Sequence, residues 1–231
     1  MKNYFESFVD EYADEIVSIQ PEFYKNAGNH INKALSSLGK KGTVLDIGNG
    51  GVINYDFSHL NKLVCADLSV SPKAQKRYEK FENIKFCEAN MLDLSQFEDN
   101  IFDAVIIQTV IHHLAGKTMR QTEENVSIGL KECFRILKMG GALLIVESTV
   151  SRWFEIFEKM CYPLMQLFFY LIRFDTVYQY SAQSLLKKIH KMSFEVEDEK
   201  EIELDKYIWL CRKKILTKLT PCKAHWIVIR K

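Results

Sequence analysis

"VLDIGNGG", at residues 44–51, is the stretch from which the architecture of this chain is most readily inferred. A β-prone run leads into Asp46, and Gly48, Gly50 and Gly51 follow, although the chain has only 10 glycines in 231 residues. Glycine is favoured where the backbone takes a positive φ or where another group approaches it closely. Three glycines within four positions therefore indicate a turn, a helix cap or a ligand site directly after a strand.

Further β-rich runs alternate with helical segments along the chain. The β-rich runs, several of them apolar throughout, cover 43–48, 62–68, 83–89, 102–110 and 141–149. Strands that are apolar on both faces belong to parallel sheets covered by helices. The alternation of strands and helices predicts an α/β protein with a doubly wound, mostly parallel sheet.

Periodicity and capping residues mark the other segments. The expected helices are 5–19, 29–38, 71–81 with Ser71 or Ser69 as N-cap and Pro72 in the first turn, 122–141 ending at Gly140–Gly141, and 152–174, interrupted near Pro163. Two last strands are expected within 195–206 and 224–231. We expect one domain over 1–231, made of N-terminal helices (1–40), a central core (41–150), a helical segment (151–193) and the last strands (194–231).

The composition is that of a globular protein without a charge bias. Apolar residues make up 47% and charged residues 26%, and the formal net charge is +1. This charge gives no support to nucleic-acid binding. The six cysteines form no CxxC pair, and the acidic N-terminus has no continuous apolar run like that of a signal peptide. We expect a cytoplasmic protein with reduced cysteines and without a metal site.

A second feature supports a ligand site beside the glycines. Asp67 ends the second β-rich run, in "CADLS". The carboxyl ends of parallel strands meet at one edge of the sheet, where ligands bind, and an acid at the end of the second strand can accept hydrogen bonds from ribose hydroxyls. Gly48 and Gly50 would then let the backbone pass close to the same ligand.

Five motifs follow one another in the order of one enzyme family. They are Asp46-Ile-Gly48-Asn-Gly50, Asp67, "EANMLDL" (88–94), "FDAVIIQTVIHHL" (102–114) and "LKMGG" (137–141). With these motifs, residues from about 40 to 150 resemble the class I S-adenosylmethionine-dependent methyltransferases. The resemblance implies a Rossmann-like fold with a seven-stranded, mostly parallel sheet, N-terminal helices and a helical insertion after the fifth strand.

The resemblance also implies S-adenosyl-L-methionine as the cofactor. The residues that it assigns to cofactor binding are Asp46, Gly48, Asn49, Gly50, Asp67, Leu68, Asn90, where many members carry Asp, Met91 and Gln108. The chain departs from the family pattern at Val52, which stands at the usual third glycine position, with Gly51 one residue earlier. The connection from Val52 to the second strand is short and rich in turn formers, so we expect a single turn or a loop there instead of a full helix.

The catalytic candidates are His112 and His113, which follow the fourth strand. Methyl transfer from a sulfonium is an in-line displacement, so much of the catalysis is the positioning of the acceptor. A hydroxyl or amine acceptor can also need a general base, and histidine serves near neutral pH. The alternative is that these histidines hydrogen-bond the backbone and shape the pocket.

The aromatic segment 152–174 has three interpretations. It could form a helical cap over an apolar acceptor pocket, with Phe157, Phe168 and Phe169 lining the substrate. It could equally be ordinary core or a dimer face. As a third possibility it could contact a membrane surface, because its apolar part is too short to span a bilayer and charged residues interrupt it.

These observations predict a methyltransferase that acts on a small, apolar or aromatic acceptor by O-, N- or C-methylation, as a monomer or homodimer. One alternative is a non-catalytic S-adenosylmethionine-binding scaffold, which the altered Gly51–Val52 pattern favours. Another is an enzyme of the same fold that transfers a different part of the cofactor. A nucleic-acid partner is not expected.

Overall fold

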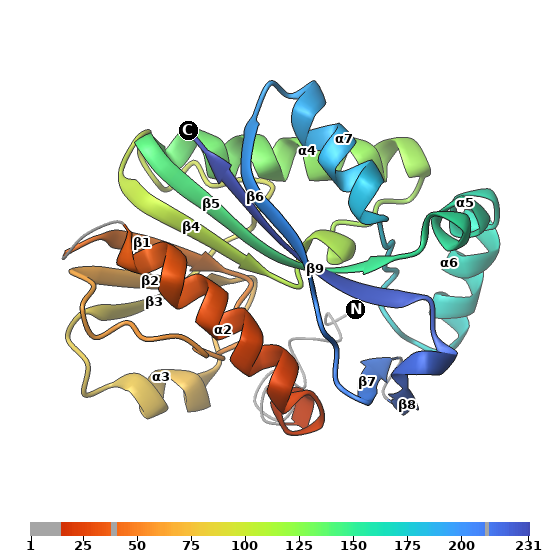
Figure 1. The fold of residues 1–231 in the computed structure, drawn as a ribbon, viewed down its shortest axis with the longest axis horizontal. Coiled ribbons are helices and arrows are strands. Elements are labelled where there is room, and N and C mark those ends of the chain that lie inside the picture. Colours follow the sequence, from red (N-terminus) through yellow and green to blue (C-terminus); the bar gives the residue numbers. More distant parts are fainter. Residues whose placement is uncertain (1–14, 38–40, 211–212) are drawn as a thin grey trace.

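The computed structural model describes residues 15–37, 41–210 and 213–231. Its centre is a seven-stranded sheet in the order β3-β2-β1-β4-β5-β9-β6 (Figure 1). These strands are β1 (Thr43–Ile47), β2 (Lys62–Asp67), β3 (Ile84–Glu88), β4 (Phe102–Gln108), β5 (Leu137–Val150), β6 (Glu195–Ile202) and β9 (Cys222–Arg230). Neighbours from β3 to β5 are parallel, and β9 pairs antiparallel with β5 and β6. The predicted doubly wound, mostly parallel sheet of seven strands is confirmed.

Helices cover both faces of the sheet. In Figure 1, α2 (Pro21–Ser36) and α3 (Pro72–Tyr78) lie on one face, and α4 (Met119–Ile136) and α7 (Ala182–Lys191) lie on the other. Two buried apolar cores result, one on each face. Successive side chains of a strand point to opposite faces, so one apolar strand can serve both cores.

Strand β4 shows this division directly. Val105 and Ile107 belong to the core that contains α4 and α7, whereas Ala104 and Ile106 belong to the core that contains α2. All four side chains are fully buried. This is why the strand is apolar throughout and shows no alternation with polar residues.

One predicted boundary, the end of the helix before β5, is wrong. Helix α4 ends at Ile136 and not at Gly140–Gly141. The next residue, Leu137, already pairs with Phe102 of β4, and β5 extends without interruption to Val150. The two glycines therefore lie within a long strand, near an irregularity in its pairing with β4.

The other helices match the sequence pattern more closely. Ser71, not Ser69, caps α3, because its Oγ accepts a hydrogen bond from Ala74 N at 2.9 Å. The connection 51–61 contains no helix, as expected. Helix α2 begins at Pro21 instead of residue 29. Of the predicted helix 5–19, residues 15–19 are helical, and the rest lies outside the described residues.

Two further groups of elements lie at the end of the sheet where the parallel strands finish (Figure 1). Helices α5 (Arg152–Met160) and α6 (Tyr162–Leu171) follow β5, and Pro163 stands in the first turn of α6, so the predicted interruption is confirmed. The pair β7 (Tyr207–Leu210) and β8 (Lys213–Leu216) forms a separate two-stranded sheet that the sequence did not predict. Short 3₁₀ turns cover Ile111–His113 and Thr217–Leu219.

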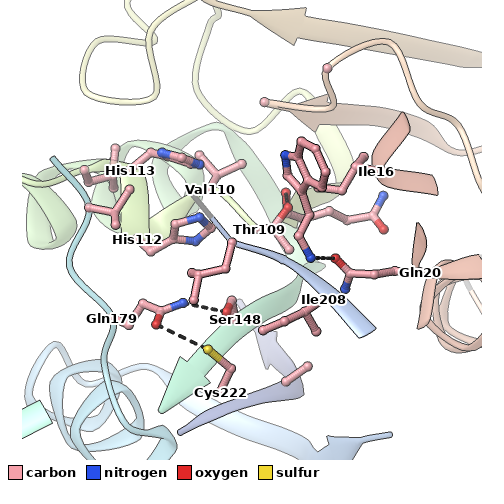
Figure 2. Close-up of a pocket in the computed structure, with 18 of the residues that line it drawn as sticks. Ile16, Gln20, Thr109, Val110, His112, His113, Ser148, Gln179, Ile208 and Cys222 are labelled. Carbon is pink, nitrogen blue, oxygen red and sulfur yellow. Dashed lines mark hydrogen bonds between the residues drawn. The ribbon is translucent and has the colours of Figure 1, made fainter. Parts of the chain in front are cut away.

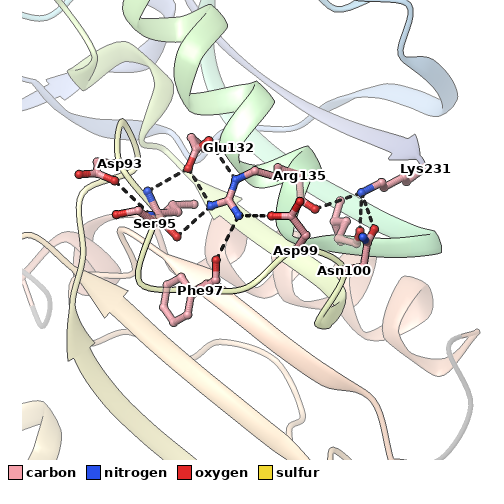
Figure 3. A network of polar contacts seen from close by, with 10 residues as sticks. Asp93, Ser95, Phe97, Asp99, Asn100, Glu132, Arg135 and Lys231 are labelled. Atoms are coloured by element: carbon pink, nitrogen blue, oxygen red, sulfur yellow. Dashed lines mark hydrogen bonds and ion pairs between the residues drawn. The ribbon is translucent and has the colours of Figure 1, made fainter.

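A polar network holds the loop after β3 against α4 (Figure 3). The Arg135 guanidinium of α4 donates to the carbonyl of Leu94 and pairs with Glu132 and Asp99. Glu132 in turn accepts a hydrogen bond from Leu94 N at 3.1 Å. The network therefore anchors at Leu94 the loop that follows Asn90, a residue that the sequence assigns to cofactor binding.

Candidate functional site

A pocket of about 400 Å³ opens at the carboxyl ends of β1, β2 and β4. One part of its wall is this edge of the sheet, and the other part comes from α5, α6 and the β7–β8 hairpin. Figure 2 shows His112 and Thr109 from the segment after β4 on one side, and Gln179 and Ser148 facing them. Residues far apart in the sequence therefore meet at the predicted edge.

The three glycines of the first motif serve different purposes. All have positive φ, 71° at Gly48, 57° at Gly50 and 80° at Gly51. A Cβ at Gly48 would lie 2.4 Å from a methyl carbon of Val110, and one at Gly51 would lie 2.7 Å from Ala74 Cβ. A Cβ at Gly50 would have no atom within 4 Å, and Gly50 lines the pocket. The turn therefore needs glycine for its backbone conformation at all three positions, and only Gly50 leaves open space on the pocket side.

Asp67 at the end of β2 is joined to this turn. Its Oδ2 accepts a hydrogen bond from Gly50 N at 3.0 Å, and its Oδ1 accepts one from Leu68 N at 2.7 Å. Burial raises the pKa of Asp67, and these backbone donors oppose the shift. Leu68 is exposed and lines the pocket together with Asp67. The Ser69 backbone also donates to this carboxylate, so three donors leave one of its four acceptor positions for a further donor.

Asp46 lies beneath the turn and is not among the described residues that line the pocket. Its Oδ2 accepts a hydrogen bond from the Tyr55 hydroxyl at 2.7 Å, and burial raises the pKa of Asp46 to about 7. Its expected place at the cofactor is therefore corrected to one of support. Asn49 does line the pocket, and its Oδ1 accepts a hydrogen bond from Gly51 N at 3.0 Å.

The remaining cofactor candidates lie along the same edge. Asn90 is exposed to the pocket, and its Oδ1 accepts a hydrogen bond from Leu92 N at 2.9 Å. Met91 is buried but also contributes to the pocket wall. Gln108 donates to Asn54 Oδ1 at 3.0 Å, whereas its own Oε1 is buried without a hydrogen-bond donor among the described residues.

His112 is held by a carboxylate that the sequence did not single out. Its Nδ1 lies 2.6 Å from Oε1 of Glu147, a buried residue of β5. The other oxygen of Glu147 accepts hydrogen bonds from Val110 N at 3.1 Å and Ile111 N at 2.7 Å. Because backbone donors occupy this carboxylate, the contact with His112 favours a proton on Nδ1 and leaves Nε2 of the neutral ring able to accept one.

His113 has a different environment from its neighbour. The two imidazole rings lie 4.0 Å apart between centroids. Burial holds the pKa of His113 well below its usual range, so this ring is neutral at physiological pH. His113 also lines the pocket. His112 has a carboxylate partner at Nδ1 and lines the pocket, and we therefore assign the base role to it below.

The part of the pocket beyond His112 is apolar and aromatic. Phe168 and Phe169 of α6 line it, as the sequence predicted. Phe157 is 50% exposed and is not among the residues that line the pocket. The aromatic lining residue of α5 is Phe154, about one helical turn before Phe157.

Four polar side chains interrupt this apolar wall. Gln179 Nε2 donates to Ser148 Oγ at 2.8 Å, and Cys222 Sγ lies 3.9 Å from Gln179 Oε1 (Figure 2). Glu158 of α5 accepts a hydrogen bond from Gln179 N at 3.3 Å. Burial is the main cause that raises the pKa of Glu158 to about 7. This part of the pocket thus contains groups that can bind a hydroxyl or carbonyl of a ligand.

Two kinds of feature are absent from the described residues. No group of three or more His, Cys, Asp or Glu side chains among them could hold a metal ion. Within the same residues, every helix is too short or too polar to cross a membrane.

Comparison with known proteins identifies the fold and the central domain. A model of the methyltransferase-domain family matches residues 45–145, which carry the glycine turn, Asp67 and His112. Residues 45–145, less than half of the chain, are therefore a methyltransferase domain of the class I S-adenosylmethionine-dependent type.

Similar methyltransferases include enzymes named for quinones. The chain is 33% identical over 122 residues to demethylmenaquinone methyltransferase of Lactococcus lactis subsp. lactis. This match covers 50% of this chain and 42% of that protein. It is 27% identical over 140 residues to the ubiquinone/menaquinone biosynthesis C-methyltransferase of Sinorhizobium fredii, covering 55% and 47%. The matched part thus spans less than half the length of these curated relatives.

Solved structures of methyltransferases share the fold. The 1,6-didemethyltoxoflavin-N1-methyltransferase of Burkholderia thailandensis, which holds 1,6-didemethyltoxoflavin and S-adenosylhomocysteine, has a TM-score of 0.63 at 13% identity over 98% of this chain and 84% of that one. The methyltransferase partner of the Haloferax volcanii Trm112 activator has a TM-score of 0.67 at 14% identity, over 100% and 98%. At these identities the likeness concerns the fold alone.

The residues at this edge of the sheet fit S-adenosylmethionine, the cofactor of the matched family. The open space at Gly50 permits the close approach of a ligand, and Asp67 offers acceptors at the same place. The buried Oε1 of Gln108 adds an acceptor at the pocket wall that lacks a described donor. These three features lie along one edge, where a molecule with ribose hydroxyls and an amine can be bound by hydrogen bonds.

Sequence reasoning missed several residues of the pocket. Glu147 had a usable signal, since an acid inside the apolar run "LLIVES" needs a partner when it is buried. Glu158 and Phe154 had none, because the helical period of α5 does not tell which face is inside. Gln179 lies in an irregular segment after α6 and carries no pattern.

Proposed function

We propose that this chain transfers the methyl group of S-adenosylmethionine to a small, apolar or aromatic acceptor that carries an ionisable hydroxyl, with His112 as the general base. The observation that carries the proposal is the contact between His112 Nδ1 and Glu147 Oε1 at the rim of the pocket. It orients the ring and favours the tautomer in which Nε2 accepts a proton. Family membership supports the reaction class.

The cofactor is proposed to bind along the sheet edge. The residues proposed to contact it are Gly48, Asn49, Gly50, Asp67, Leu68, Asn90, Met91 and Gln108. Asp67 accepts the ribose hydroxyls in this proposal, while the hydrogen bond from Gly50 N keeps its carboxylate in place. Asp46 supports the turn from below through Tyr55.

The acceptor is proposed to lie against Phe154, Phe168 and Phe169, with its polar substituents toward Glu158 and Gln179. An apolar wall with a few convergent polar groups suits a flat ring that bears hydroxyl or oxo groups. The quinone-related names of similar proteins support a phenol or quinol as the first class to test.

S-adenosylmethionine supplies an electrophilic methyl group when bound. His112 then takes the proton of the acceptor hydroxyl at Nε2, and Glu147 stabilises the charged imidazolium through Nδ1. The aromatic wall of α6 excludes water from the reacting groups and holds the acceptor in line.

Two measurements test the proposal. Calorimetry should show binding of S-adenosylmethionine to the wild type, and Asp67→Ala should weaken it by about ten- to a hundredfold because a charge-assisted hydrogen bond is lost. Formation of S-adenosylhomocysteine should then be followed with phenol and quinol acceptors. Binding without any product would favour the non-catalytic scaffold, and consumption of the cofactor without S-adenosylhomocysteine would favour transfer of another group.

A single domain over 1–231, a cytoplasmic location and a monomeric or homodimeric state stay predictions.

A further inference from the structure

Helix α5 carries its two acidic side chains inward, and most of its apolar side chains face outward beside the exposed Arg152 and Lys159. Glu155 and Glu158 are buried, with exposed fractions of 8% and 3%, whereas Trp153 and Met160 are exposed by 67% and 78%. The inner carboxylates have partners, since Glu155 accepts hydrogen bonds from the hydroxyl of Ser181 at 2.6 Å. A helix on the surface of a globular protein has the opposite arrangement. The outer face of α5 is therefore built to meet something other than water.

Helix α6 continues the same apolar surface. Leu164, Leu167 and Leu171 are exposed by 66%, 53% and 69%, and their spacing of three and four residues places them on one side of the helix. Ten of the fourteen large apolar side chains that are exposed in the described chain lie between Trp153 and Ile172. Exposed apolar surface gathered in this way marks an interaction site. We call it the α5–α6 face.

A basic segment lies next to this face. Its described residues, 206–210 and 213–219, include four Lys and no Asp or Glu. All four, Lys206, Lys213, Lys214 and Lys218, are exposed. The segment ends close to the start of α5, because the carbonyl of Pro221, two residues after it, accepts a hydrogen bond from Ser151 N at 3.2 Å. We call residues 206–210 and 213–219 the basic hairpin.

The pocket opens between the α5–α6 face and the basic hairpin. Phe168 belongs to both surfaces, since it is 48% exposed and also lines the pocket. Trp209 and Leu210 of the basic hairpin line the pocket from the other side. An apolar path therefore leads from the outer face of α6 into the acceptor side of the pocket.

We propose that the α5–α6 face and the basic hairpin form a docking surface for a bilayer that contains anionic phospholipid. The apolar side chains enter the interfacial layer, and the lysines interact with the lipid phosphates. Charge complementarity favours this occupant over a second copy of the chain. In a symmetric dimer the lysines of the basic hairpin would need acidic partners, but the acids of α5 are buried and face inward. Since no described helix is long and apolar enough to span, the chain lies on the bilayer.

Docking does not depend on methyl transfer, although it would place the pocket mouth where a lipid-soluble acceptor can enter directly. Vesicle flotation without cofactor or acceptor tests it alone. The wild type is mixed with vesicles of phosphatidylcholine, or of phosphatidylcholine with phosphatidylglycerol, at low and high salt. We expect binding to the anionic vesicles that weakens as salt screens the lysines.

Two double variants test the two parts of the surface. Lys213→Glu with Lys218→Glu should lower partitioning onto anionic vesicles at least about 25-fold, because each basic residue near such a surface contributes roughly fivefold. Leu164→Glu with Leu171→Glu should lower it at least about tenfold on both lipid mixtures. None of these four residues lines the pocket, and all are exposed, so the fold should survive.

Matched controls carry the same changes elsewhere on the surface. They are Lys76→Glu with Lys85→Glu, and Ile128→Glu with Met139→Glu, all at exposed positions away from α5, α6 and the basic hairpin. Retained binding in both controls supports the proposal. Wild-type protein that fails to float with anionic vesicles overturns it, and so does an equal loss in variants and controls. A wild-type dimer that Leu164→Glu with Leu171→Glu converts to monomer, without any vesicle binding, assigns the α5–α6 face to a second copy instead.

Discussion

Glu147 holds His112 in place, with 2.6 Å between Oε1 of the carboxylate and Nδ1 of the ring. The same carboxylate accepts hydrogen bonds from the backbone of Val110, Ile111 and Ser148, so it also fixes the turn on which His112 stands. A buried carboxylate with this many donors is a firm anchor for a ring at the rim of a pocket. The proposed base therefore depends on a residue of the neighbouring strand.

Replacing Glu147 by Gln should disable the base and leave cofactor binding intact. An amide can keep one acceptor for the backbone, but its NH₂ would donate to His112 Nδ1 and move the ring proton to Nε2. We expect kcat to fall by about a hundredfold or more. The dissociation constant of S-adenosylmethionine should change less than about twofold by calorimetry. An unchanged kcat would show that His112 is not the base.

Alanine at Gly50 and at Gly48 should have different effects. Gly50→Ala has open space for its methyl group and incurs only left-handed backbone strain of about 1–2 kcal/mol, so it should fold while losing at least about tenfold in cofactor affinity. Gly48→Ala brings its Cβ against Val110 and should lose much more stability. Thermal unfolding alongside calorimetry distinguishes the two. Full cofactor affinity in a folded Gly50→Ala would remove Gly50 from the cofactor site.

Three phenylalanines of α5 and α6 should respond differently to truncation. Phe168→Ala should raise the KM for the acceptor with little loss of stability, because this side chain is half exposed and lines the pocket. Phe169→Ala should cost about 3–5 kcal/mol of stability, because only 4% of this residue is exposed. Phe157→Ala is the control, and neither quantity should change. An acceptor KM that is the same in Phe168→Ala and the wild type would contradict the proposed acceptor position.

Stability should depend on pH through Glu158. Burial raises the pKa of this carboxyl to about 7, so between its ordinary value and about 7 the folded state binds more protons than the unfolded chain. The free energy of unfolding must then fall as the pH rises through this window. Glu158→Gln removes this contribution, and at about pH 8 we expect it to be more stable than the wild type by roughly 1–3 kcal/mol. Urea unfolding of the wild type and Glu158→Gln at about pH 5 and about pH 8 measures this difference. If the free energy of unfolding changes equally with pH in both proteins, the explanation is wrong.

The sheet and the cofactor edge could be predicted from the sequence because their signals are local. Apolar runs of strand length gave the parallel strands, and the glycine turn with Asp67 marked their carboxyl edge. Asp46 belongs to the same motif, yet its side chain supports the turn and does not line the pocket. The motif therefore indicates that Asp46 belongs to the site, and the structure shows whether its side chain lines the pocket or supports the turn.

Apart from Phe168 and Phe169, the proposed acceptor side could not be predicted because its contacts are distant in sequence or depend on helix orientation. Glu147 and His112 come from different elements, and only the pairing of β4 with β5 brings them together. The apolar residues of α5 favoured Phe157 as a lining residue, but the helix turns its carboxylates inward. The β7–β8 hairpin lacked a turn signal and escaped prediction entirely.

The central claim is that the chain moves a methyl group from S-adenosylmethionine to an aromatic hydroxyl compound bound beside His112. The most direct measurement uses S-adenosylmethionine with an isotope-labelled methyl group, a set of phenols and quinols, and mass spectrometry of both products. We expect the label to appear in one acceptor in equal amount with S-adenosylhomocysteine, at a rate reduced at least about a hundredfold in His112→Gln. Two results would contradict the account. In one, the protein binds the cofactor but the label stays on the cofactor; in the other, His112→Gln transfers the label as fast as the wild type.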